Sequence, residues 1–99
     1  MTEQEIRKAI GALLAKHAAA LAGIRVMLFG SRARGEAHER SDFDIGLLGP
    51  RPVPAALLAK LQDELESVPT LIRFDVVDLG RVSADFRDAA LDEAEVLLE

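Results

Sequence analysis

Two aspartates separated by a single residue, Asp42 and Asp44, are the side chains in this sequence that most clearly suggest chemistry. They stand at the start of an apolar run typical of a strand, and residues two apart on a strand point to the same face. Two carboxylates held side by side repel each other unless a cation compensates them. Mg²⁺ prefers carboxylate oxygens and often takes one or two of them together with substrate phosphates. The pair therefore suggests a divalent metal site, although a lone Asp-x-Asp is more commonly a turn cap followed by a solvated strand residue.

A glycine turn precedes this pair. Gly30 and Ser31 directly follow an apolar run, and ten residues separate Ser31 from Asp42. Glycine lets the backbone approach a phosphate closely, and the N–H groups that open the next turn are free to bind an anion. Arginine suits triphosphate oxygens, and three arginines lie in this stretch: Arg32, Arg34 and Arg40. Taken alone, a plain Gly-Ser turn with solvated arginines explains the stretch about equally well.

A third acid, Asp75, lies inside the apolar run from Phe74 to Val77. An unpaired buried charge is costly, so this carboxylate must reach a sheet edge, a partner or a metal. Asp78 is nearer the end of the run and is more simply a solvated or capping residue. We therefore predict Asp75 as the third acid of the site, with Asp78 as the alternative.

The elements that would position these acids follow from periodicity and capping signals. Thr2 and Glu5 match a capping box, and Ser31 and Ser83 are candidate N-caps of a short helical turn and of the last helix. The pattern predicts helices over 3–21, 54–67 and 84–94, strands over 24–29, 43–48, 72–78 and 96–98, and a short turn of helix ending at Gly35. The order predicts an α/β (α+β) fold, with helices packed on a small mixed sheet, in one domain spanning residues 1–99. The sequence does not decide whether the last strand forms an edge of the sheet or contacts a partner. A homo-oligomer and a hetero-oligomer are therefore both compatible with it.

The composition narrows the classes of function. The chain has 99 residues, no cysteine and a net charge of −5. Disulfides and thiolate metal sites are thus excluded, and the negative charge disfavours broad binding to nucleic acid, which relies on many basic contacts. No apolar run approaches the roughly 20 residues of a membrane span, and the polar N-terminus is unlike a secretory signal. These features predict a cytoplasmic protein without a membrane or nucleic-acid partner.

The aromatic content limits how a nucleobase could be held. There are four phenylalanines and neither tyrosine nor tryptophan. Three of the phenylalanines lie in apolar runs, where core packing is the better interpretation.

The whole motif resembles that of the nucleotidyltransferase superfamily that includes DNA polymerase beta. It comprises Gly30-Ser31, ten intervening residues, Asp42-Phe43-Asp44, and an Asp in an apolar strand about thirty residues later. The form "GSRARG…SDFD…FDVVDL" is most similar to the minimal members, the MNT proteins. The resemblance implies that Asp42 and Asp44 bind two Mg²⁺ ions (or Mn²⁺). It also implies that Asp75 supports the metal that activates the attacking hydroxyl, and that the Gly-Ser turn holds the triphosphate of ATP.

Some MNT proteins are antitoxins that transfer AMP to a tyrosine of a HEPN-domain toxin, so the resemblance implies ATP and a HEPN-type protein as partners. Larger members hold the acceptor in a further domain, whereas only about twenty residues follow the third acid here. We therefore expect the acceptor to lie on another protein. Two alternatives remain: a non-catalytic module that covers its partner, and nucleotidyl transfer to a small molecule or an RNA end. The three acids together favour the enzyme.

Overall fold

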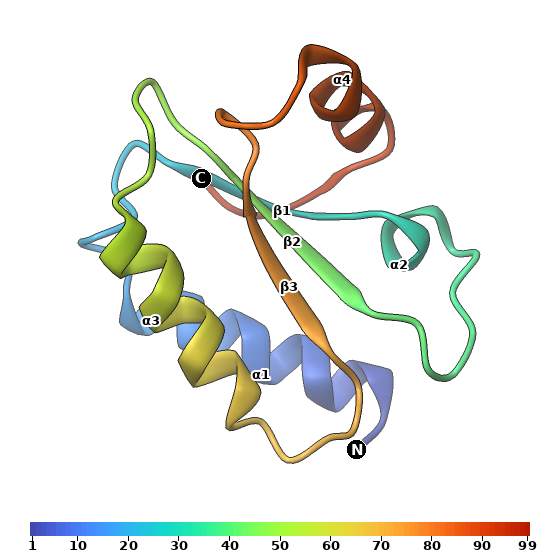
Figure 1. Cartoon of the computed structure of the whole chain (residues 1–99). Helices are drawn as coiled ribbons and strands as arrows, with labels where there is room; N and C mark the ends of the chain where they lie inside the picture. Colours follow the sequence, from blue (N-terminus) through green and yellow to red (C-terminus); the bar gives the residue numbers. More distant parts are fainter.

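A single four-stranded sheet organises the molecule, and the computed structural model describes all residues from 1 to 99. In chain order the elements are α1 (Glu3–Lys16), β1 (Arg25–Phe29), α2 (Ser31–Arg34), β2 (Phe43–Leu48), α3 (Ala55–Glu66), β3 (Phe74–Asp78), α4 (Ala84–Asp92) and β4 (Glu95–Leu98). The strand order is β3-β2-β1-β4; β1 runs antiparallel to β2 and β4, and β2 runs parallel to β3 (Figure 1). The expected α+β fold with a mixed sheet is thus confirmed.

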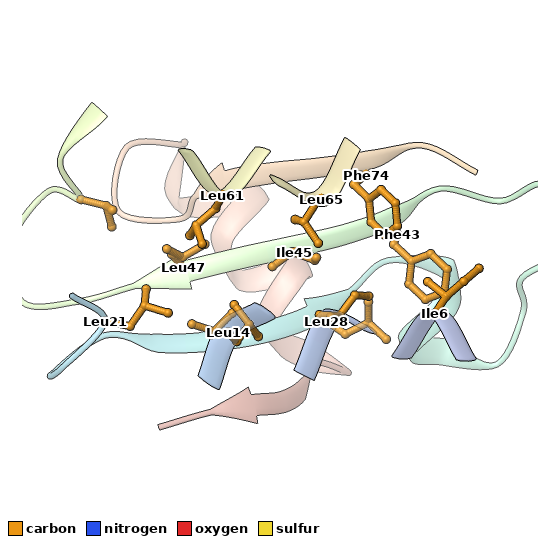
Figure 2. Packing of buried hydrophobic residues seen from close by; sticks show 13 residues of the cluster. Ile6, Leu14, Leu21, Leu28, Phe43, Ile45, Leu47, Leu61, Leu65 and Phe74 are labelled. Carbon is orange, nitrogen blue, oxygen red and sulfur yellow. The ribbon is translucent and has the colours of Figure 1, made fainter. Parts of the chain in front are cut away.

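Helices cover both faces of this sheet. α1 and α3 lie on one face, and their apolar side chains meet those of the central strands in the larger core cluster (Figure 2). Its members include Ile6, Leu14, Leu28, Phe43, Ile45, Leu47, Leu61, Leu65 and Phe74. α4 lies over the opposite face (Figure 1), where a smaller cluster contains Met27, Phe29, Leu79 and Ala90. Because side chains alternate along a strand, this division decides on which face any strand residue lies.

The helix termini agree in part with the capping signals. The Thr2 side chain accepts a hydrogen bond from the Glu5 N–H, and the Glu5 carboxylate accepts one from the Thr2 N–H, so the predicted capping box is present. Ser83 caps α4 by accepting a hydrogen bond from the Phe86 N–H. Ser31, in contrast, is not a cap: Gly30 holds that position, and no side-chain hydrogen bond closes the start of α2.

The first helix is shorter than predicted. α1 ends at Lys16 rather than at residue 21, and turns then lead the chain to Gly23, whose φ is +80°. Leu21 is nevertheless buried in the larger core cluster. The apolar periodicity of the sequence extends past the end of α1 because Leu21, a turn residue, occupies the next position in the core.

The two edge strands are held in place by different contacts. β4 pairs with β1, which settles the last strand as an edge strand starting at Glu95. On the other edge, the Gln62 side chain of α3 donates to the Phe74 carbonyl oxygen at 2.8 Å and accepts from the Val76 N–H at 3.0 Å. This side-chain amide takes the place of a neighbouring strand and fixes β3 against α3. None of the helices combines the length and the apolar character that crossing a membrane requires.

Candidate active site

The sheet register brings the acids of the sequence motif to one end of the sheet. Asp44 of β2 is the register partner of Asp75 in the parallel ladder, and it lies opposite Phe29 in the antiparallel one. Asp42 stands two residues before Asp44, and Gly30 directly follows Phe29. The end of β1 and the starts of β2 and β3 lie at the same end of the sheet (Figure 1), and the register sets Asp44 and Asp75 there, beside the glycine turn.

The acids lie on the face of the sheet that α4 covers in part. Asp44 stands between Phe43 and Ile45, which both point into the α1/α3 core, so its own side chain belongs to the opposite face. Phe29, its partner on β1, contributes to the cluster beneath α4. Asp44 is half-buried, whereas Asp42 and Asp75 are exposed, so a ligand can approach them from solvent.

The surroundings of the Asp44 carboxyl disfavour its ionised form. Burial raises the pKa of the Asp44 carboxyl above its ordinary value, and the negative charges of Asp75 and Asp42 raise it further. The positive charge of Arg34 acts in the opposite direction. Ionised Asp44 is therefore held in an environment short of positive charge, which a bound cation would correct.

Glycine is the only residue type that fits at position 30, next to the Asp44 carboxylate. Its φ of +74° and ψ of −157° lie in a region that is essentially restricted to glycine. A Cβ at this position would also collide with the Asp44 carboxylate oxygen Oδ2. The backbone of the turn therefore runs directly against Asp44, and the N–H groups of Ser31 and Arg32, which open α2, have no acceptor within that helix.

Gly30→Ala is accordingly expected to weaken binding of Mg²⁺–ATP by about tenfold, because it combines backbone strain with displacement of the Asp44 carboxylate. Isothermal titration calorimetry measures this affinity. Gly35→Ala is the matched control: Gly35 also has a positive φ, of +72°, but a methyl group added there would meet no atom within 4 Å. Equal losses of affinity in the two variants would contradict a specific role for the Gly30–Asp44 contact.

Arg32 does not lie where the expected phosphate contact requires it. Its guanidinium donates to the Ser41 carbonyl oxygen at 2.7 and 3.1 Å and to the Glu3 carboxylate at 2.6 Å. The guanidinium carbon sits 4.5 Å from the centre of the Phe43 ring, on the α1 side of the sheet. The hydrogen bond from Arg32 also lowers the pKa of Glu3. This buried arginine ties α2 to α1, and we leave it out of the proposed phosphate-binding residues.

The other two arginines remain available. The Arg34 side chain is exposed, pairs with Glu36 at 3.2 Å and lies within electrostatic reach of Asp44. Arg40 is exposed and lines a cleft of about 990 Å³ that also includes Asp42, Leu71 and Arg73. The cleft therefore offers space for a second molecule beside Asp42.

Of the two roles expected for Asp78, solvated or capping, the structure shows the capping one. Asp78 is buried, and its carboxylate accepts hydrogen bonds from the Val53 N–H and the Gly80 N–H, both at 2.9 Å. Arg81 pairs with it at 3.3 Å. Asp78 therefore holds two loops together at the other end of β3, and Asp75 is the acid of this strand that lies beside Asp44.

Comparison with known families agrees with this arrangement. A family model described as "Polymerase beta, Nucleotidyltransferase" matches residues 10–99. The chain belongs to this nucleotidyltransferase family. The resemblance seen in the motif is thereby confirmed, and the match extends through α4 and β4, beyond the segment that carries the motif.

Solved structures show the same fold in other nucleotidyltransferases and their complexes. A protein named as a minimal nucleotidyltransferase is 30% identical, with 96% of this chain and 95% of that chain covered and a TM-score of 0.66. A chain of a toxin–antitoxin complex with AMP-PNP is 23% identical, with 89% and 72% covered and a TM-score of 0.69. A chain of the tri-AMPylated Shewanella oneidensis HEPN toxin in complex with MNT antitoxin is 21% identical, with 98% and 72% covered and a TM-score of 0.68. No curated protein sequence is significantly similar to the chain.

The donor set of this nucleotidyltransferase-family site fits a divalent metal in its chemistry. Carboxylate oxygens are the ligands Mg²⁺ prefers. Burial raises the pKa of Asp44, and the charges of Asp75 and Asp42 raise it further; a bound cation would relieve this repulsion. As the side chains stand, no three His, Cys, Asp or Glu groups lie close enough together to hold an ion. Since Mg²⁺ is commonly bound by one or two carboxylates together with substrate phosphates, a metal at this site would share its ligands with the nucleotide.

Proposed function

We propose that this chain transfers AMP from ATP to a tyrosine hydroxyl of a HEPN-type toxin and thereby acts as the toxin's antitoxin. The observation that carries the proposal is the register that puts Asp44 beside Asp75 and against the Gly30 turn. Carboxylates next to a glycine turn with free N–H groups suit a metal-bound triphosphate. The ATP donor and the absence of cysteine suit action in the cytoplasm.

The three acids would act together on the reacting groups. Asp42 and Asp44, with Asp75 in support, would hold two divalent cations, Mg²⁺ or Mn²⁺. When bound, such ions would supply positive charge that stabilises the attacking and the leaving oxygen of an in-line displacement. Asp75 is exposed at the start of β3, where its carboxylate can accept the proton of the attacking hydroxyl.

The glycine turn and two arginines would hold the triphosphate. The backbone at Gly30 and Ser31 would bind phosphate oxygens through N–H groups, and the Ser31 hydroxyl would add a donor. The acceptor oxygen forms a bond to the α-phosphorus, the bond from that phosphorus to the bridging oxygen breaks, and pyrophosphate leaves. Arg34 and Arg40 would offset the charge on this leaving group.

A partner protein as acceptor is supported by two observations. The chain contains no tyrosine of its own, and two chains of similar fold occur in complexes described as a toxin–antitoxin with AMP-PNP and as a tri-AMPylated HEPN toxin with its MNT antitoxin. An added AMP brings negative charge and bulk, which would repel RNA from a nearby basic site on the toxin.

The test mixes this protein with a purified HEPN-type toxin, ATP and Mg²⁺, and weighs that toxin by intact mass spectrometry. We expect the partner to gain one or more AMP units and to gain none when Asp42→Asn replaces the wild-type chain, because the amide keeps the shape but loses the charge that holds the cation. EDTA should abolish the gain as well.

Two other outcomes would overturn the proposal. A partner that stays unmodified yet is inhibited at a one-to-one ratio would establish a covering module. Modification of an RNA end or a small molecule, with no change of the partner's mass, would move the acceptor to another class.

A further inference from the structure

Phe86 is unlike the other three phenylalanines of the chain. Phe29, Phe43 and Phe74 are 7%, 0% and 6% exposed, whereas Phe86 is 47% exposed. An aromatic ring left in solvent on a helix is a surface that a flat ligand can cover. It is therefore the only phenylalanine with substantial area open to a nucleobase.

The position of Phe86 is tied to the carboxylate site through Phe29. The two ring centres are 6.1 Å apart and the ring planes meet at 82°. Phe29 is the register partner of Asp44 and directly precedes Gly30. Phe86 thus lies over the same face of the sheet as the acids, and neighbouring strands are only about 5 Å apart.

The edge-to-face contact leaves an open stacking surface. In this arrangement the edge of one ring meets the face of the other, so Phe29 covers at most one face of Phe86. At least one flat side of the ring is not used by Phe29, in agreement with the 47% exposure of the residue.

The ring is also carried on a well-anchored element. The Ser83 hydroxyl accepts a hydrogen bond from the Phe86 N–H at 3.2 Å. The next residue, Arg87, donates from Nε to the Leu79 carbonyl oxygen at 2.7 Å, and Ala90 of the same helix is buried. The start of α4 is therefore fixed to the segment that follows β3, which holds Phe86 in place against Phe29.

We propose that Phe86 is the platform on which the base of the nucleoside triphosphate stacks. The inference rests on the proposed function and adds how the donor nucleotide is recognised. Asp85 and Asp88 are exposed residues close to Phe86 in the sequence of α4, and their charges disfavour phosphate near this helix but do not repel an uncharged base. Stacking depends on the flat face of the base and not on its hydrogen-bonding edge. ATP and GTP should therefore bind with similar affinity, and both should bind more tightly than CTP or UTP.

Phe86→Leu and Phe86→Tyr form the matched pair for the test. Leucine keeps an apolar contact with Phe29 but removes the flat face, whereas tyrosine keeps that face. Calorimetry in Mg²⁺ should give about a tenfold loss of ATP affinity for Phe86→Leu. Phe86→Tyr should retain the wild-type affinity, and both variants should bind inorganic tripolyphosphate as the wild type does.

Phe86→Trp gives an independent readout. Because the chain has no tryptophan, this variant would contain a single one, placed at the stacking position. ATP should quench its fluorescence, whereas tripolyphosphate should not.

The outcomes separate the platform from the proposed function. If the wild type binds Mg²⁺–ATP and Phe86→Leu binds it equally well, the platform is wrong while the nucleotidyltransferase proposal stands. Equal losses for ATP and tripolyphosphate would assign Phe86 to the structure of α4 and overturn the platform. A wild-type chain that binds neither ligand would overturn both.

Discussion

Asp44→Asn is expected to lower the rate of AMP transfer by about a thousandfold, the scale seen when a group that stabilises transition-state charge is removed. Asp44 is the acid that touches most of the site: it partners Asp75 across the ladder, lies opposite Phe29 and contacts the backbone of the Gly30 turn. The amide keeps these positions but cannot supply the charge that a divalent cation needs.

Initial rates of AMP addition, followed by intact mass at saturating ATP and Mg²⁺, measure the effect. Asp63→Asn is the matched control, because Asp63 is an exposed acid on α3, away from the glycine turn. We expect it to react at the wild-type rate. An Asp44→Asn variant that keeps even a tenth of the wild-type rate would remove Asp44 from the metal-binding residues.

The same variant should be more stable than the wild type when no metal is present. Because the pKa of Asp44 is raised in the folded state, ionising it costs folding free energy, and the wild type loses stability as the pH rises through the unfolded and then the folded pKa. Asn does not titrate, so the stability advantage of Asp44→Asn should be absent at low pH and present at neutral pH. Thermal melts from pH 3 to 7 in EDTA test this, and adding Mg²⁺ and ATP should favour the wild type, since ligand binding stabilises the folded state.

Local patterns were sufficient to predict the sheet and the strands on which Asp44 and Asp75 lie. Asp42 precedes β2, which starts at Phe43, and the choice of Asp75 over Asp78 followed from its place between apolar residues. The register that sets Asp44 beside Asp75 agrees with this choice of partner, while the role of these acids in binding metal stays a prediction.

Contacts between distant segments were beyond what the sequence could predict. Asp78 was expected to be solvated or to cap a turn, and the Gly80 N–H that it accepts fits the second role, but its other donor, the Val53 N–H, is 25 residues away along the chain. The position of Phe86 against Phe29 likewise depends on how α4 returns across the sheet. Neither pairing leaves a periodic signal, because each depends on tertiary packing and not on local spacing.

The arginines illustrate the same limit, because spacing alone could not separate Arg32 from Arg34. Arg32 is buried against Glu3 and Phe43, whereas Arg34 is exposed near Asp44. Arg32→Met is therefore expected to lower the free energy of unfolding by about 2–3 kcal/mol, because it removes charge-assisted hydrogen bonds to the Ser41 carbonyl oxygen. Glu3 keeps partial access to solvent, which holds the loss below that of a fully buried ion pair.

Arg34→Met should have the opposite profile. Its side chain pairs only with exposed Glu36, so its loss should change the free energy of unfolding by less than about 0.5 kcal/mol. Its positive charge faces the carboxylate site, so affinity for Mg²⁺–ATP should fall about fivefold, in keeping with one exposed charge contact. Urea unfolding and calorimetry on the two variants measure both quantities. If Arg32→Met instead left stability unchanged and reduced ATP affinity more than Arg34→Met, Arg32 would return to the phosphate-binding residues, and the contact between α2 and α1 would have to open when nucleotide binds.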